Sequence, residues 1–174
     1  AGPGGADNAL QFDEGHWLQL GETGVEVEGN WTLDCHVFVD TRALQSMEGD
    51  GVLLWSSAAA DPVSMRPDLE SSLSAAGEGW HHVTIHSVDR EQRRRQSVLV
   101  DGTQMALSER EIALGDRSTT FESVGAAASP SFPLPIYRLR LFPGLISPHS
   151  TRTVRNSFAP LPYHDENSRW VEIS

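Results

Sequence analysis

The amino-acid sequence predicts an all-β protein, a sandwich or barrel of antiparallel strands with at most one or two short helices. Apolar residues alternate with polar ones in most segments, turn-forming residues separate these segments, and a persuasive helix start occurs only once. The chain of 174 residues has the size of one domain. We therefore expect a single domain over residues 1–174, with tails at 1–8 and about 160–174.

The first half of the chain contains three segments with the pattern of half-buried strands. They are ALQFDEGHWLQL (9–20), WTLDCHVFVDT (31–41) and GVLLWSS (51–57). In the second segment Leu33, Cys35 and Val37 share one face, because successive side chains of a strand point to opposite sides. Cys35 is therefore expected in the core rather than as a nucleophile, and as the single cysteine it excludes an intrachain disulfide.

The second half contains further candidate strands. They are HHVTIHSV (81–88), QSVLVDG (96–102), QMAL (104–107), FESVGA (121–126) and PIYRLRLF (135–142). In the last segment, Tyr137 is predicted to share the core face with the leucines, opposite Arg138 and Arg140. The residues expected to be buried together are Leu33, Cys35, Val37, Val83, Ile85, Leu139 and Leu141, with either Val98 or Leu99.

Turn and helix signals connect these strands. Asp101-Gly102 is the pair that a two-residue hairpin favours, and the run from 90 to 96 is expected to be a longer polar connection. Ser147-Pro148 is a helix start that leads into a short segment at 148–156. Residues 58–77 are expected to be mostly loop, with weak helix potential around 68–75.

Charge and hydropathy argue against nucleic-acid binding and against a transmembrane segment. A formal net charge of −11 argues against nucleic acid, because a phosphate-binding surface usually needs a basic excess. The longest apolar runs are about five residues, far short of the roughly 20 that a membrane-spanning helix needs. We therefore expect neither nucleic-acid binding nor a transmembrane segment.

The order of five segments carries a family resemblance. The segments are ALQFDEGHWLQL, WTLDCHVFVDT, GWHHVTI, SVLVDGT and VGAAASPSFPLPIYRLRLFPGLIS. Together they resemble the laminin G-like and pentraxin-like branch of the concanavalin A-like lectin/glucanase superfamily, over most of residues 9 to 155. The resemblance implies a jelly-roll sandwich of two antiparallel sheets, one concave and one convex. It also favours an extracellular or organelle-luminal location.

The resemblance raises the question of calcium, which members of this branch often bind. They carry an acidic pair early in the last long strand, where this chain has Tyr137 and Arg138. The acidic pairs Asp13-Glu14 and Asp165-Glu166 are expected on loops, and a calcium ion needs six to eight oxygen ligands. The sequence therefore supports neither a calcium site nor a cofactor.

The superfamily also includes glycosidases, which place carboxylates on one strand face as Glu-x-Asp-x-Glu. The closest match is VEVEGN, where Glu26 and Glu28 would share a face but the next position on that face is Asn30. A retaining glycosidase needs two carboxylates about 5 Å apart. The incomplete array predicts a protein that is not an enzyme, with glycoside hydrolysis as the less favoured interpretation.

Two groups of residues are candidates for binding. Arg90, Arg93, Arg94 and Arg95 are expected to be exposed at a hairpin tip, where they would grip an anionic glycan or an acidic protein, or remain a solvated tip. The second group lies on the strand faces that point away from the core: His36, Phe38, His82 and His86. Rings beside polar groups suit sugar stacking or a protein interface, and a covered second layer is the equal alternative.

The sequence thus predicts a non-catalytic recognition module that binds a glycan or a protein surface. The alternative is a structural or accessory subunit of a larger assembly, a lectin-like sandwich without sugar binding. The apolar end of the chain, with Trp170, Val171 and Ile173, favours this alternative, because it is not part of the predicted sandwich pattern and would lie on a neighbour.

Overall fold

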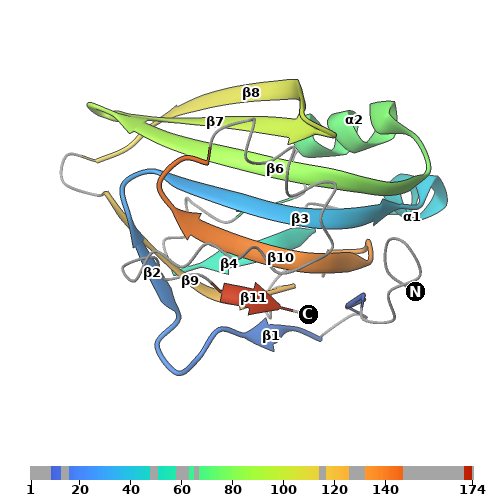
Figure 1. The fold of residues 1–174 in the computed structure, drawn as a ribbon, viewed down its shortest axis with the longest axis horizontal. Helices are drawn as coiled ribbons and strands as arrows, with labels where there is room; N and C mark the ends of the chain where they lie inside the picture. The colour runs from blue at the N-terminus through green and yellow to red at the C-terminus, as the bar shows by residue number, and fades with distance from the viewer. Residues whose placement is uncertain are drawn as a thin grey trace.

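The computed structural model describes residues 9–12, 16–47, 51–57, 63–64, 67–113, 117–125, 132–146 and 171–173. Within these ranges the chain forms two antiparallel sheets and two short helices (Figure 1). The predicted all-β class is therefore confirmed. The helix start at Ser147-Pro148 and the acidic pairs Asp13-Glu14 and Asp165-Glu166 lie outside the described residues.

The larger sheet has six strands in the order β11-β10-β3-β6-β7-β8. In Figure 1 it runs from β8 at the top down to β11. Its strands are β3 (Trp31–Val39), β6 (Gly79–Arg90), β7 (Arg93–Val100), β8 (Thr103–Glu111), β10 (Ile136–Pro143) and β11 (Val171–Ile173). Strand β11 pairs with β10, so this part of the expected C-terminal tail forms an edge of the protein's own sheet.

The smaller sheet has five strands, with β1, β9, β4 and β5 in order and β2 also paired with β9. Its strands are β1 (Leu18–Gln19), β2 (Val25–Glu28), β4 (Val52–Ser56), β5 (Val63–Ser64) and β9 (Ser118–Val124). Strands β1 and β2 follow one another along β9, and a turn at 21–23 separates them. This turn borders the cleft described below.

The core lies between the two sheets and follows the predicted alternation. The seven residues expected to be buried together all belong to one hydrophobic cluster, and Val98 joins it. Trp31 of β3 packs edge-on against Phe121 of β9, with ring centroids 5.4 Å apart, so the two sheets meet through aromatic rings as well as aliphatic side chains. Burial in the core raises the pKa of the Cys35 thiol, which keeps it protonated and unreactive.

The two helices differ in how well the sequence indicates them. Helix α2 (Pro67–Ala76) covers the weak helix potential expected at 68–75 and contributes Leu69 and Leu73 to the core. Helix α1 (Thr41–Gln45) was not predicted, although its start has a clear signal. The Asp40 side chain accepts hydrogen bonds from the backbone N–H groups of Arg42, at 2.8 Å, and Ala43, at 3.2 Å.

The hairpins around β7 confirm one expected turn and correct another. Asp101 and Gly102 have φ angles of 51° and 79° and join β7 to β8, as the pair predicts. The expected long connection over 90–96 is wrong. Strands β6 and β7 pair up to Arg90 and Arg93, so only Glu91 and Gln92 form the tip, and the arginine run lies inside a strand.

A β-bulge in β10 overturns the predicted facing of Tyr137. Tyr137 pairs with His36, and Arg140 pairs with Asp34. Arg138 and Leu139 of β10 therefore lie opposite the single residue Cys35 of β3. Arg138 takes the left-handed conformation there, with a φ of 50°. The extra residue shifts the alternation by one position. Tyr137 therefore lies on the outer face with Arg140, opposite the core face that Leu139 occupies.

Candidate functional site

The arginine run at the β6–β7 hairpin does not form one exposed cluster. Arg90, Arg93 and Arg95 are exposed, but the expectation that Arg94 is exposed is wrong, because its side chain is only 2 % exposed. Alternation along β7 explains this, since Arg94 lies in the same row as Asp89 on the core face of the sheet. A signal was present in the sequence, because Arg94, Gln96, Val98 and Val100 are spaced by two.

Arg94 joins the two sheets at the end of the sandwich. Its guanidinium donates two hydrogen bonds to Asp89, from Nε to Oδ1 at 2.6 Å and from Nη2 to Oδ2 at 2.7 Å. A third, from Nη1, reaches the Thr119 hydroxyl of β9 at 2.9 Å. The bidentate geometry is the strong form of a carboxylate contact. Arg94 is therefore a structural residue.

The exposed arginines lie among acidic side chains. Arg93 donates to Glu109 across the strand pair at 2.9 Å, and both side chains are largely exposed. A shallow depression beside the tip is lined by Glu91, Gln92, Arg93, Glu111 and Arg117. Positive and negative groups thus alternate over this surface, and exposed pairs of this kind contribute little to stability.

The four aromatic and histidine candidates share the outer face of the six-stranded sheet. In the register of β3 and β6, His36 pairs with His82, and Phe38 pairs with Trp80. His36 and His82 are buried, whereas Phe38 and His86 are partly exposed. The structure therefore brings these side chains to one face as expected, but leaves His36 and His82 little surface for a ligand.

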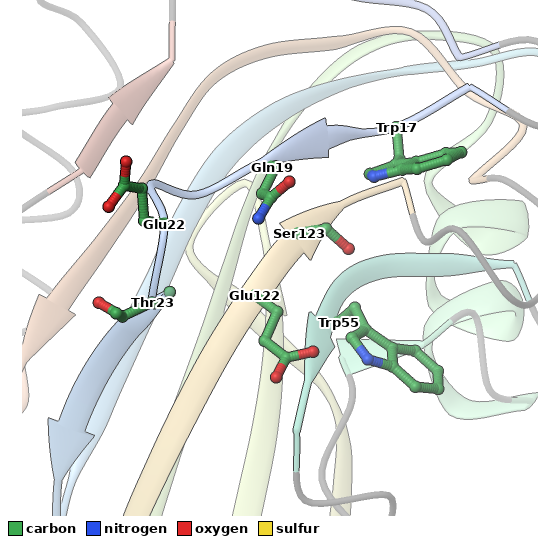
Figure 2. A pocket seen from close by; sticks show the side chains of 8 residues that line it. Trp17, Gln19, Glu22, Thr23, Trp55, Glu122 and Ser123 are labelled. Carbon is green, nitrogen blue, oxygen red and sulfur yellow. The ribbon is translucent and has the colours of Figure 1, made fainter.

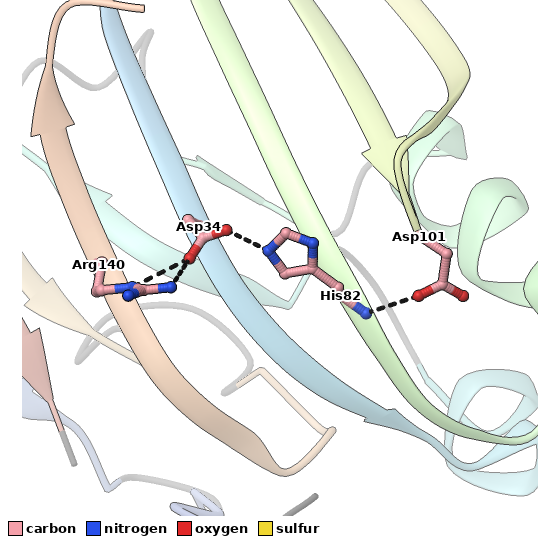
Figure 3. Close-up of polar contacts among 4 residues, drawn as sticks. All are labelled: Asp34, His82, Asp101 and Arg140. Atoms are coloured by element: carbon pink, nitrogen blue, oxygen red, sulfur yellow. Dashed lines mark hydrogen bonds and ion pairs between the residues drawn. The ribbon is translucent and has the colours of Figure 1, made fainter. Parts of the chain in front are cut away.

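A buried charged network crosses this outer face (Figure 3). The Asp34 carboxylate contacts His82 Nε2 through Oδ1 and accepts from Arg140 through Oδ2, from Nε at 3.0 Å and from Nη2 at 2.5 Å. Burial opposes ionisation of Asp34, but the hydrogen bonds and charges of His82 and Arg140 outweigh it and hold the pKa of that carboxyl below its ordinary value. Asp101 continues the line of contacts by accepting from the backbone N–H of His82 at 3.2 Å.

Aromatic rings extend this network toward one end of the sheet. The His36 ring lies 5.0 Å from the His82 ring and 6.1 Å from the Tyr137 ring, and Phe38 packs edge-on against Trp80 at 5.5 Å. Burial lowers the pKa of His36 to about 4, and the charge of neighbouring His82 acts in the same direction. His36 is therefore neutral at physiological pH.

His86 lies apart from this network at the other end of β6. It pairs with Thr32, and its Nε2 atom is buried without a hydrogen-bond partner among the described residues. Burial lowers the pKa of His86, although a hydrogen bond with the Ile146 backbone opposes the shift. The histidines of this face are thus held mostly as neutral or paired groups within the fold.

The two carboxylates that most resemble a glycosidase pair have exposed side chains on β2. Glu26 and Glu28 are exposed on β2, and Glu26 accepts a hydrogen bond from the Ser118 hydroxyl at 2.5 Å. Asn30, the next residue on that face by sequence, instead uses its Oδ1 to accept from the backbone N–H of Asp89 at 2.9 Å. Asn30 is thus engaged in joining β3 to the end of β6.

A cleft that the sequence did not predict lies on the outer face of the five-stranded sheet (Figure 2). In the strand register Ser123 of β9 pairs with Gln19 of β1 on one side and with Trp55 of β4 on the other. Trp17 directly precedes β1 and lines the same cleft as Gln19. Trp55 of β4 and Trp17 therefore line one cleft together with polar side chains.

A second β-bulge adds a carboxylate to this cleft. Trp55 pairs with Ser123 and Ser56 pairs with Phe121, which leaves Glu122 as the extra residue of β9. The bulge turns Glu122 outward beside Ser123. In Figure 2 its carboxylate extends toward the Trp55 indole.

The cleft has the size and chemistry of a small-ligand site. Its volume is about 380 Å³. The lining residues are Trp17, Gln19, Glu22, Thr23, Gly24, Trp55, Glu122 and Ser123. Trp17 is 48 % exposed, so its indole ring is accessible to a ligand in the cleft. In the sequence, Trp17 at the polar phase of an alternating run was a usable signal, but the approach of β1 to β4 across β9 was not readable.

Among the described residues, no group of three or more His, Cys, Asp or Glu side chains could hold a metal ion. In the same part of the chain, no helix is long and apolar enough to cross a membrane. No protein-family model matches the sequence, and no curated protein matches it significantly.

Proposed function

We propose that this protein is a non-catalytic recognition module and that it binds a glycan in the cleft between Trp17 and Trp55. The observation that supports this is a cleft lined by the exposed Trp17 indole and by Trp55, together with the side chains of Gln19, Glu122 and Ser123. Indole rings can stack on the apolar face of a sugar, while carboxylate, amide and hydroxyl groups bind its hydroxyls. The resemblance to laminin G-like domains is compatible with this role and remains a prediction.

Oligosaccharide titration followed by tryptophan fluorescence and calorimetry tests the proposal. Replacing Trp17 or Trp55 by alanine should weaken binding about fivefold or more, because each substitution removes a stacking surface. Trp80→Ala is the matched control, because Trp80 lies on the other sheet and should leave affinity unchanged. The bound oligosaccharide should be recovered uncleaved. Equal affinity of wild type and both cleft variants would refute the assignment, and cleavage would refute the non-catalytic role.

A specific observation supports a structural role as the second candidate. Strand β8 forms an edge of the six-stranded sheet, and its Met105 and Leu107 are 40 % and 46 % exposed. An exposed sheet edge with apolar side chains is suited to pairing with another chain. A stable complex from the native source that Leu107→Lys dissociates, together with no glycan binding, would favour an accessory subunit.

A further inference from the structure

We propose that the cleft on the five-stranded sheet selects glycans that carry protonated amino groups over neutral and anionic ones. This inference rests on the proposed glycan-binding function and specifies its ligand class. It follows from the charge of the lining residues and from the position of Glu122.

The charges around the cleft have one sign. Glu22 and Glu122 line it, and none of its described lining residues is basic, although the chain contains 13 arginines. The exposed arginines of β6 and β7 lie on the other sheet. A uronate or sulfate in the cleft would therefore meet two carboxylates and no compensating cation, whereas an ammonium group would be attracted. The net charge of −11 also attracts cationic ligands to the protein over a longer range.

The geometry places a carboxylate beside an aromatic ring. Glu122 is the bulged residue, and its exposed side chain extends toward the Trp55 indole (Figure 2). A carboxylate next to an indole is a favourable environment for an ammonium group, because the ion pair and the attraction to the ring act together. A neutral hydroxyl at the same position would gain only a hydrogen bond.

The opposite wall is formed by the turn between β1 and β2. The backbone of Leu20 donates to the Glu122 carbonyl at 2.8 Å, which fixes this turn beside the bulge. The turn carries Glu22 and Thr23, and Figure 2 shows the two side chains on the side of the cleft away from the tryptophans. Aromatic rings thus lie at one end and a second carboxylate at the other, so an oligosaccharide with several amines would find acidic groups at both positions.

The test compares β-1,4-linked glucose oligosaccharides of equal length that differ at one substituent. At C2, cello-oligosaccharide carries a hydroxyl, chito-oligosaccharide an acetamide and its deacetylated form an amine. A β-1,4-linked oligoglucuronate, with a carboxylate at C6, supplies the anionic case. Calorimetry at low salt, at a pH where the amines are protonated, should rank the amine first and the uronate last. Glu122→Gln should reduce the affinity for the amine ligand about fivefold and leave the cello-oligosaccharide unchanged, as loss of one ion pair predicts.

Glu28→Gln is the matched control, because Glu28 is an exposed glutamate of the same sheet that does not line the cleft. It removes the same charge and should change no affinity. Added salt should reduce the preference for the amine, since exposed charges are screened over about 8 Å at physiological ionic strength. Equal affinity for amine and neutral ligands, with both sensitive to Trp17→Ala, would overturn this inference and leave the proposed function standing. Binding of none of the four ligands would overturn both.

Discussion

Arg94 shows how strongly one residue's role depends on which face of a strand it occupies. It lies between two exposed arginines, yet its guanidinium is buried against Asp89 and Thr119. Removing one partner of a buried ion pair leaves the other charge poorly compensated. Its neighbours at the hairpin carry the same charge and are solvated.

Arg94→Gln should therefore lower the free energy of unfolding by about 3–5 kcal/mol, because the buried Asp89 carboxylate would lose its bidentate partner. Arg95→Gln, one residue away and exposed, should change it by less than about 0.5 kcal/mol. Urea unfolding of the two variants measures the difference. Similar losses in both would show that the bidentate contact with Asp89 is not a source of stability.

At the scale of elements, two β-bulges determine which side chains reach the outer faces. The bulge in β10 moves Tyr137 to the face of His36 and Arg140, and the bulge in β9 turns Glu122 into the cleft. Simple alternation describes the strand on either side of a bulge, but the phase changes across it. Each bulge forms against a strand from much earlier in the sequence, β3 for the bulge in β10 and β4 for the bulge in β9.

The turn between β1 and β2 depends on a glycine that contacts β9 closely. Gly24 has a φ of 75°, and a Cβ atom there would lie 2.6 Å from the Phe121 carbonyl oxygen. Gly24→Ala should cost about 1–2 kcal/mol for the left-handed backbone and a further 1–3 kcal/mol for the clash. It should also weaken glycan binding, because Gly24 lines the cleft.

Gly29→Ala is the control for backbone conformation alone. Gly29 has a φ of 70°, but no atom lies within 4 Å of the position that a Cβ atom would take, so only the first cost should apply. Thermal and urea unfolding of both variants would separate the two contributions. Equal losses would mean that β9 moves to accept the added methyl group.

For the whole molecule, the outer face of the six-stranded sheet makes stability depend on pH. His36 is buried with a pKa of about 4, below its ordinary value of 6.5, so the unfolded chain binds its proton more readily than the folded protein does. Stability should therefore fall as the pH decreases from about 6.5 to about 4. Asp34 has a lowered pKa, so its contribution is retained above its ordinary value of 3.8 and is lost as the pH falls through its lower value in the folded protein.

Between pH 6.5 and pH 4, the wild type should lose on the order of 3 kcal/mol of stability through protonation of His36 in the unfolded chain, and His36→Gln should not show this loss. The measurement is the free energy of unfolding in urea at several pH values, compared between variant and wild type. His86 also has a lowered pKa, so it should contribute to the pH dependence as well. The free energy of unfolding of His36→Gln should therefore depend on pH less steeply than that of the wild type, but the dependence should not disappear. His16→Gln, at an exposed position, should keep the wild-type slope, and an unchanged slope in His36→Gln would contradict the assignment.

Local sequence indicated the long strands β3 and β6, the core and the Asp101-Gly102 hairpin. Of the described residues in the predicted strand segment 9–20, however, only Leu18–Gln19 forms a named strand, and β2, β5 and β11 were not predicted. Alternation over a few residues is enough to indicate a half-buried strand, and a turn residue with positive φ acts within its own hairpin. Leu33, Cys35 and Val37 therefore occupy the core as predicted. The grouping of His36 with His82 on one outer face also follows from alternation, once β3 and β6 are paired.

Tertiary structure decided which polar side chains became buried and where the cleft formed. Asp34 is paired with Arg140, 106 residues away, and Trp17 reaches the same cleft as Trp55 only because β1 and β4 flank opposite sides of β9. Pairing partners, register and bulges are set by contacts between distant segments, so they cannot be predicted from the local pattern around a residue. The physical reason is that a strand's own sequence fixes the alternation of its faces, whereas only its neighbours in the sheet fix what each face meets.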